Sequence, residues 1–185
     1  LGGEHSITPP LVAAAAAKYP GLHVLQIDAH ADLRDSYMGT RHNHACAMRR
    51  SLEYAPVTQV GIRSMSTEEA RQAPGLKTRI FYDHSMRQDP RWIDRVVETL
   101  GDPVYITIDV DGLDPAIMPA TGTPEPGGLS WYEALTLLRA TSSIRTVRAC
   151  DVVELSPLPG LLAPNFLCSK LIYKMLTYKY GPELR

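Results

Sequence analysis

Cysteine is scarce in this chain, and its placement argues against two kinds of site. Only Cys46, Cys150 and Cys168 are present. An odd number without regular spacing argues against a disulfide framework and fits a reducing cytosol. None of the three forms a C-x-x-C pair, so a thiolate metal site is not expected. We therefore expect a cytoplasmic protein whose chemistry does not depend on sulfur.

An excess of charge and a long apolar run are also lacking. The formal net charge is −1 and the pI is about 6.6, so no basic field is available to attract nucleic acid or an anionic membrane. No apolar run reaches the ~20 residues that span a bilayer. The longest, residues 11–17, is short and rich in alanine. We expect a small-molecule substrate, and neither a nucleic acid nor a membrane as partner.

Internal repeats and low-complexity linkers are lacking too, and 185 residues favour a single domain over two. We assign residues 1–185 to one domain. The first residue is Leu rather than Met, and Leu1-Gly2-Gly3 is typical of a strand that enters a loop. We interpret the chain as a portion of a longer domain, the alternative being a mature chain that begins at Leu1.

Short apolar runs alternate with amphipathic stretches along the whole chain. Strands separated by helices of ten or more residues pair in parallel through right-handed crossovers. The pattern therefore predicts the α/β class with a central parallel sheet. The predicted strands are 22–27, 57–62, 78–82, 104–108 and 147–153. The predicted helices are 9–19, 45–53, one that starts with 66–72, 91–100, 131–141 and 165–178.

Asp28, His30 and Asp32 follow the first predicted strand at every second position. On an extended segment these side chains share one face, where two carboxylates and an imidazole can hold a divalent cation. The alternative is a solvated turn whose polar residues cap the next element. In open parallel sheets ligands lie at the carboxyl ends of strands, which favours the metal site.

Asp109 and Asp111 repeat this pattern after an apolar strand. A buried ionised pair is costly unless a cation neutralises it. The alternative is a turn in which Asp111-Gly112 marks the end of the strand. Glu154 also follows an apolar run, so three strands deliver acidic groups to one edge.

His5 follows two glycines that let the backbone approach a site closely. A single loop histidine is more often structural, but here it accompanies two acidic clusters. Oxygen-rich ligation with some imidazole suits Mn²⁺, and two bridging carboxylates suit two ions about 3.5 Å apart. The combined ligand set is His5, Asp28, His30, Asp32, Asp109 and Asp111.

At these residues the sequence resembles the ureohydrolase family, which includes arginases and agmatinases. The similar segments run in family order and cover nearly the whole chain. They are Gly-Gly-Glu-His-Ser at 2–6, Asp-Ala-His-Ala-Asp at 28–32, Asp-Val-Asp-Gly-Leu-Asp-Pro at 109–115, Thr-Gly-Thr-Pro-Glu-Pro-Gly-Gly-Leu at 121–129 and Asp-Val-Val-Glu-Leu-Ser-Pro at 151–157. The resemblance implies a three-layer arginase-like fold that lacks the family's N-terminal portion. It also implies a homo-oligomer, a trimer or a hexamer.

The resemblance implies a role for each member of the ligand set. His5, Asp28, Asp32 and Asp109 hold the first Mn²⁺. His30 and Asp111 hold the second together with Asp28 and Asp109, which bridge the two ions. Glu4 stands where the family often has Asp, and as a carboxylate behind the ligands it is expected to orient His5.

The resemblance also implies the residues that act on the substrate. Glu154 pairs with the guanidinium group, the alternative being a loop-capping acid. His44 is the proton shuttle, and His42 is its rival because both lie in the same loop. Asp111 or Asp32 accepts a proton from the attacking water. His44 and Glu154 are thus the expected substrate contacts, with Asp111 as a further catalytic residue.

The expected reaction is hydrolysis of agmatine to putrescine and urea. Arginases resemble one another in an Asp-Ile-Asn-Thr run, whereas this chain has Asp32-Leu33-Arg34-Asp35. The Glu125-Pro126 pair is also more agmatinase-like. The alternatives are arginase or guanidinobutyrase activity, and a catalytically silent relative that binds regulatory partners.

Overall fold

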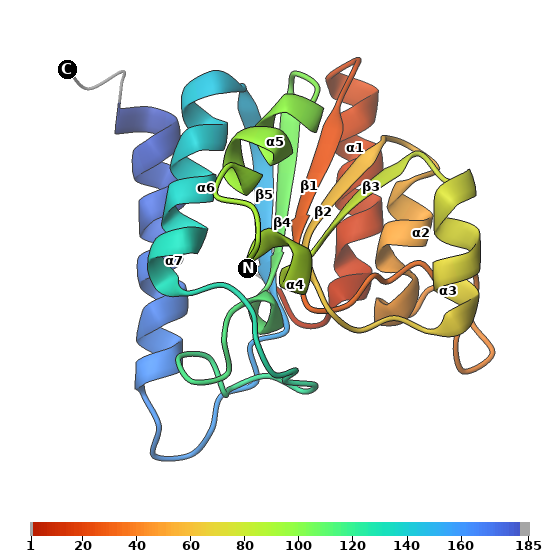
Figure 1. Ribbon diagram of the computed structural model, residues 1–185. Coiled ribbons are helices and arrows are strands. Elements are labelled where there is room, and N and C mark those ends of the chain that lie inside the picture. Colours follow the sequence, from red (N-terminus) through yellow and green to blue (C-terminus); the bar gives the residue numbers. More distant parts are fainter. Residues whose placement is uncertain (1, 182–185) are drawn as a thin grey trace.

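The computed structural model describes residues 2–181, and a parallel sheet forms its centre. The five strands lie in the order β3-β2-β1-β4-β5 (Figure 1). All four neighbouring pairs are parallel, as the alternation of strands and helices predicts. The strands are β1 (His23–Ile27), β2 (Val57–Ile62), β3 (Thr78–Tyr82), β4 (Val104–Asp109) and β5 (Val147–Val153).

Helices cover both faces of the sheet, so the fold has three layers (Figure 1). One face carries α1 (Thr8–Lys18), α2 (Ala47–Ser51) and α3 (Thr67–Gln72), and the other carries α5 (Trp92–Thr99), α6 (Trp131–Ile144) and α7 (Ala163–Tyr180). The short α4 (Asp83–Met86) was not predicted, because four residues are too few to show a helical period. Short 3-10 helices complete the set: η1 (His5–Ile7), η2 (His44–Cys46), η3 (Ala73–Gly75) and η4 (Val110–Gly112).

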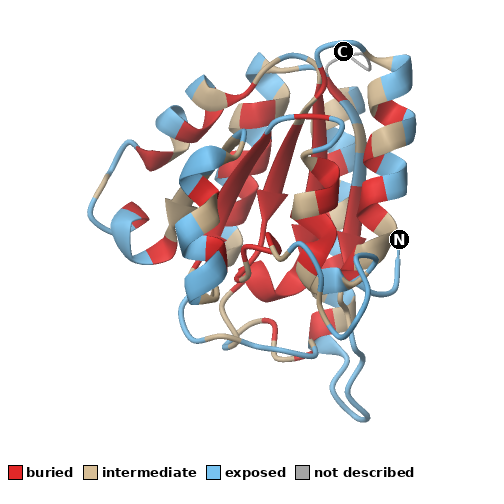
Figure 2. Ribbon diagram, turned by 90° about the vertical axis from the view of Figure 1, so that its right-hand side faces the viewer, coloured by how far each residue is buried: buried red, intermediate tan, exposed pale blue. Residues whose placement is uncertain are grey.

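Each face of the sheet has its own apolar core. One core packs strand residues such as Ile106 and Ile108 against α5, α6 and α7, through side chains that include Leu137 and Leu171. The other packs Val24, Val57 and Tyr105 against α1 and α2. Figure 2 shows the strands buried between helices whose outer faces are exposed. Burial on both faces explains why the strands read as nearly continuous apolar runs.

The predicted helix ends are largely confirmed. Ser66 and Ser130 each accept a hydrogen bond from the third residue of the helix, and Glu69 and Glu133 return it, so both helices begin with a capping box. The predicted helix 45–53 is shorter than expected. It is split into η2 and α2, because the Asn43 side chain caps a 3-10 turn before the α-helix begins.

The strand order places a topological switch point between β1 and β4. The chain runs outward through β2 and β3, then returns to the other side of β1 to form β4 and β5. Ligands of open parallel sheets bind at such a point, beyond the carboxyl ends of the strands. Asp28 follows β1 and Asp109 ends β4, so both stand at the switch point.

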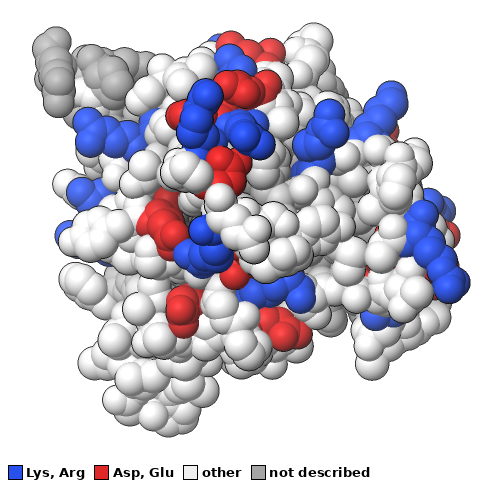
Figure 3. Space-filling model, viewed as in Figure 1, with Lys and Arg blue, Asp and Glu red and all other residues white. Residues whose placement is uncertain are grey.

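Charge and hydropathy at the surface agree with the sequence. On the face drawn in Figure 3, Lys and Arg are interspersed with Asp and Glu. Within residues 2–181, no helix combines the length and apolar character that a membrane crossing needs. All three cysteines are free.

Candidate metal centre

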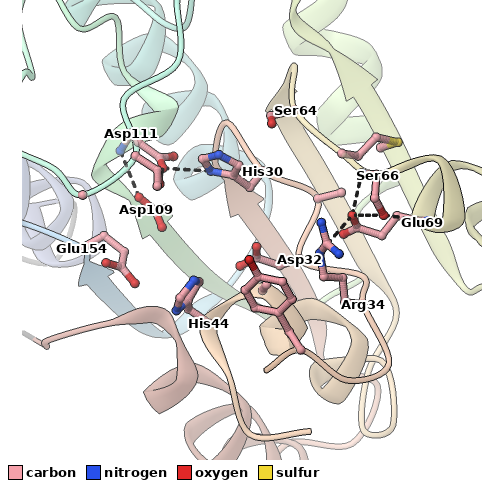
Figure 4. Close-up of a pocket in the computed structure, with 16 residues that line it drawn as sticks. His30, Asp32, Arg34, His44, Ser64, Ser66, Glu69, Asp109, Asp111 and Glu154 are labelled. Carbon is pink, nitrogen blue, oxygen red and sulfur yellow. Dashed lines mark hydrogen bonds and ion pairs between the residues drawn. The ribbon is translucent and has the colours of Figure 1, made fainter. Parts of the chain in front are cut away.

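A pocket of about 430 Å³ opens at the carboxyl edge of the sheet. In Figure 4, Asp109, Asp111 and Glu154 lie on one side, and Arg34 and Glu69 lie opposite. The structure therefore brings the polar residues at the ends of β1, β4 and β5 into one cavity. The remaining members of the expected ligand set that line it are His30 and Asp32.

His5 forms the deepest part of the site. Its side chain is fully buried, and its Nδ1 lies 3.0 Å from Asp32 Oδ2, 3.2 Å from Asp28 Oδ2 and 3.5 Å from Asp109 Oδ2. Among the described residues, none gives Nδ1 a hydrogen bond of good geometry. A buried ring nitrogen aimed at three carboxylates is the arrangement that a cation would complete.

His30 forms a second cluster on the solvent side of the first. Its Nδ1 lies 3.0 Å from Asp111 Oδ2 and 3.7 Å from Asp28 Oδ1. Ligand atoms of Asp28, His30 and Asp111 lie within 4.8 Å of one another, as do those of His5, Asp28 and Asp109. Asp28 is thus common to both clusters and turns one oxygen to each.

The backbone reaches this arrangement in a way that was not predicted. We expected Asp28, His30 and Asp32 on one face of an extended segment, but β1 ends at Ile27 and Asp32 has a positive φ of 53°. The His30 amide donates to Asp28 Oδ1 at 2.6 Å, which folds the segment into a turn. The side chains converge because the turn, rather than the strand pleat, aims them.

Glu154 is the second site residue with an unusual backbone, at φ 65°. A non-glycine residue in the left-handed region costs free energy and persists only where surrounding contacts hold it. Here the Glu154 amide donates to the Gly3 carbonyl, and Glu154 Oε1 accepts from the His5 amide at 2.7 Å. The strained residue therefore joins the end of β5 to the segment that carries His5.

The crowded carboxylates oppose one another's ionisation. Burial and the charge of Asp28 raise the pKa of Asp32 to about 7 and raise the pKa values of Asp109 and Asp111. Burial alone would raise the pKa of Asp28, but His30 and His5 outweigh it and lower that pKa. Burial opposes a charge on His30, yet Asp111 and Asp28 raise its pKa to about 11.

This electrostatic strain predicts how the stability of the metal-free protein depends on pH. The pKa of Asp32 rises from 3.8 to about 7 on folding, so its protonated form favours the folded state and this contribution is lost between about pH 4 and pH 7. We expect the melting temperature in chelator to fall between about pH 4 and pH 7. A bound cation replaces the proton, so Mn²⁺ should remove most of that fall. Scanning calorimetry with and without Mn²⁺ measures both trends, and a chelated sample that becomes more stable over this range would contradict the assignment.

The two rival loop histidines occupy different places. His44 lines the pocket beside Glu154, and Figure 4 shows both side chains at its rim. One ligand atom each from Glu4, His44 and Glu154 lie within 4.8 Å of one another. His42 instead lines a separate surface pocket with Arg41 and Tyr54. The geometry thus favours His44 over its rival as the residue near a substrate.

The expectation that Glu4 orients His5 is wrong. The Glu4 carboxylate is half exposed and accepts hydrogen bonds from the amide and hydroxyl of Ser6. It caps the 3-10 turn that begins at His5, and among the described residues its hydrogen-bond partner is Ser6 rather than the imidazole. The partner of the His5 ring is Thr107, whose Oγ1 lies 3.0 Å from Nε2.

Several residues of the site were missed in the sequence. Arg34 and Tyr37 line the pocket opposite the acids, with the Arg34 guanidinium carbon 4.7 Å from the Tyr37 ring centroid. Arg63 donates to the carbonyls of Asp111 and Glu125 and so fixes the long loop over the sheet. No spacing rule connects Arg63 to that loop, because the contact depends on the tertiary fold.

The residues present fit a pair of divalent cations. Two clusters of imidazole and carboxylate share Asp28, and the orphaned Nδ1 of His5 points into one of them. Donors of this kind, without thiolate, match the oxygen and nitrogen ligation of binuclear hydrolases. Glu125 adds a further oxygen 3.8 Å from His30 Nε2.

Comparison with known proteins identifies the family of this chain. The Arginase family model matches residues 1–177. An N(1)-aminopropylagmatine ureohydrolase of Synechocystis is 41% identical over 96% of this chain, and one of Thermus thermophilus is 39% identical over 97%. The crystal structure of an agmatine ureohydrolase of Thermoplasma volcanium superposes with a TM-score of 0.86 at 36% identity, over 98% of this chain.

The similarity extends along nearly the whole chain but not along the whole of the relatives. The chain spans 59% and 61% of the two curated relatives and 62% of the Thermoplasma protein. Within that span the three-layer fold with its parallel sheet agrees with the expected arginase-like architecture. On the family match and on these identities, the chain belongs to the arginase family.

Proposed function

We propose that the chain is a binuclear manganese ureohydrolase that converts agmatine to putrescine and urea. The observation that carries this proposal is the pair of His–carboxylate clusters joined by Asp28, beside a pocket lined by His30, Asp32, Asp109, Asp111 and Glu154. A metal pair beside a carboxylate suits the hydrolysis of a cationic, carbon-centred group.

In this proposal each cluster holds one ion. His5, Asp28, Asp32 and Asp109 hold the first. His30 and Asp111 complete the second, with Asp28 and Asp109 shared. When bound, the two ions lower the pKa of a water molecule and so supply a nucleophile near neutral pH. Mn²⁺ is favoured by four carboxylates and two imidazoles without a thiolate.

The other residues hold the substrate and move protons. The Glu154 carboxylate faces the pocket and accepts charge-assisted hydrogen bonds from the guanidinium group. Asp111 or Asp32 accepts the proton of the attacking water, since both carboxylates line the same cavity. His44, at the rim, donates a proton to the leaving amine.

The part of the substrate beyond the guanidinium group, its tail, is inferred less directly. The arginase-like Asn run is replaced by Leu33-Arg34-Asp35, which removes polar contacts suited to an α-amino acid head. The relatives named N(1)-aminopropylagmatine ureohydrolase favour an extended form of the same substrate as a second candidate. Both candidates present the same guanidinium to the site and differ in the cationic tail, which the aminopropyl group lengthens and provides with one more amine.

A urea-release assay with Mn²⁺ tests the proposal. The substrates are agmatine, N(1)-aminopropylagmatine, arginine and guanidinobutyrate, with a chelated sample as control. We expect metal-dependent urea from agmatine or its aminopropyl derivative and at least about 100-fold lower kcat/KM for arginine, because the Asn run that suits an α-amino acid head is replaced in this chain. A preference for arginine or guanidinobutyrate would contradict agmatine as the substrate. Release of urea from none of the four compounds would favour a catalytically silent relative.

A further inference from the structure

A row of polar side chains crosses the sheet directly beneath the metal centre. Gln59 on β2, Gln26 on β1, Thr107 on β4 and Asp151 on β5 are successive register partners. All four are buried, at exposures of 0–3%, on the face that α1 covers. Polar residues in the middle of a buried parallel sheet are costly unless they are satisfied.

The row lies one pleat before the metal ligands. Asp28 follows Gln26 by two positions, and Asp109 follows Thr107 by two, so each pair shares a side of the sheet. Each half of the row then continues as a hydrogen-bond chain to one ligand of the centre.

The first chain ends on Asp28. The Thr78 hydroxyl donates to Gln59 Oε1 at 3.0 Å, and Gln59 Nε2 donates to Gln26 Oε1 at 2.6 Å. Gln26 Nε2 then donates to Asp28 Oδ2 at 2.6 Å. Because every step donates in the same direction, the amide of Gln26 can present only N–H to the carboxylate. The chain supports Asp28 in its ionised, acceptor form.

The second chain begins at His5 and runs the other way. The Thr107 hydroxyl donates to Asp151 Oδ1 at 2.6 Å, and Asp151 also accepts from the Tyr105 and Thr8 hydroxyls at 2.5 Å and 3.0 Å. Because the Thr107 hydroxyl donates its only hydrogen to Asp151, its oxygen accepts the hydrogen bond from His5 Nε2. The hydrogen of the imidazole is then fixed on Nε2, and the lone pair of Nδ1 faces the carboxylates.

We propose that this row is a positioning layer that presents His5 and Asp28 to the metal in their ligating forms. One chain donates a hydrogen bond to the carboxylate of Asp28, and the other accepts a hydrogen bond from the imidazole of His5. The inference rests on the proposed function, since it takes both residues as metal ligands. Thr107, Asp151 and Gln26 are positioning residues and touch neither the ion nor the substrate.

A purely structural role makes a different prediction. If these hydroxyls served only to hydrogen-bond the buried Asp151 carboxylate, the loss of any one of its three donors would have the same effect on Mn²⁺ affinity. In the positioning account Thr107 differs from Tyr105, because only Thr107 also contacts His5. Likewise Gln26 differs from Thr78, because only Gln26 contacts Asp28.

The test is Mn²⁺ affinity, measured on the full chain by calorimetric titration after chelation. Thr107→Val keeps the shape of the side chain and removes its hydroxyl. We expect its affinity to fall about 10- to 100-fold, the usual effect of losing a group that supports a metal ligand. Thr107→Ser should restore most of it, and Tyr105→Phe, the matched control, should stay within about threefold of the unmodified chain.

The first chain, which ends on Asp28, has its own pair of variants. Gln26→Met should lower the Mn²⁺ affinity about 10-fold or more, while Thr78→Val, at the far end of the same chain, should leave it nearly unchanged. Denaturant unfolding of each variant in chelator shows that it folds. Thr107→Val with unmodified affinity overturns the inference, and so does Tyr105→Phe with an equal loss.

The proposed function fails separately. If the unmodified chain binds no Mn²⁺, the function and the positioning layer both fall. If it binds Mn²⁺ and releases urea while all five variants bind equally well, only the positioning layer is overturned.

Discussion

Replacing the shared carboxylate, Asp28→Asn, is expected to abolish Mn²⁺ retention and urea production together. Asp28 is the one residue common to the two described clusters, with Oδ2 3.2 Å from His5 Nδ1 and Oδ1 3.7 Å from His30 Nδ1. Asparagine keeps the shape but loses the charge and one acceptor oxygen. We expect turnover to fall at least about 1000-fold, since both the nucleophile and its electrostatic support depend on the ions.

The matched control for that variant is Asp94→Asn. Asp94 lies exposed on α5, and its carboxylate has an ion pair only with Arg91 among the described contacts. Metal content by mass spectrometry and urea release are measured on both proteins. A metal-depleted Asp28→Asn protein at full activity would contradict the two-metal account.

Glu154→Gln is expected to separate metal binding from turnover. Glu154 Oε1 accepts from the His5 amide at 2.7 Å, and a glutamine carbonyl can keep that bond and the backbone it holds. The guanidinium group would lose its anionic partner. Removing one member of a buried charge pair costs about 2–5 kcal/mol, so kcat/KM should fall roughly 30- to 4000-fold while metal content stays at the unmodified level.

Glu4→Gln is the control for this second variant. Glu4 lies beside Glu154 at the rim, but its carboxylate is half exposed and bonds to Ser6. It should change kcat/KM by less than about 10-fold, because exposed charges contribute little. If Glu154→Gln keeps the unmodified rate, Glu154 is not the partner of the guanidinium group.

The parts of the site that follow strands could be predicted from the sequence. Asp28 and Asp109 each come at the end of an apolar run, and parallel pairing brings the ends of neighbouring strands to one edge. The order of the strands adds what local pattern cannot give. It makes β1 and β4 neighbours, so residues 81 positions apart in the chain contact one imidazole.

The parts that depend on backbone detail could not be predicted. The left-handed conformations of Asp32 and Glu154 leave no mark in composition or period, since neither residue is glycine. The Glu4 carboxylate was expected behind His5, but the 3-10 turn at residues 5–7 directs it to Ser6 instead. Only the local fold decides which hydrogen-bond partner a short loop selects.

The polar row also escaped prediction, although its residues were in view. Gln26, Thr107 and Asp151 interrupt apolar strands, and each in isolation is compatible with an ordinary strand. That they form one continuous row is evident only from the strand register, which aligns them across four strands. A buried polar residue two positions before a predicted metal ligand is the signal that could have indicated it.

The count of Mn²⁺ ions in the unmodified chain tests the central claim most directly. Equilibrium dialysis against Mn²⁺ gives the stoichiometry, and electron paramagnetic resonance shows whether the bound ions are coupled. The two clusters around Asp28 predict two ions per chain with the spectrum of an exchange-coupled pair. One ion per chain, or two that give the spectrum of isolated Mn²⁺, would contradict a shared binuclear centre.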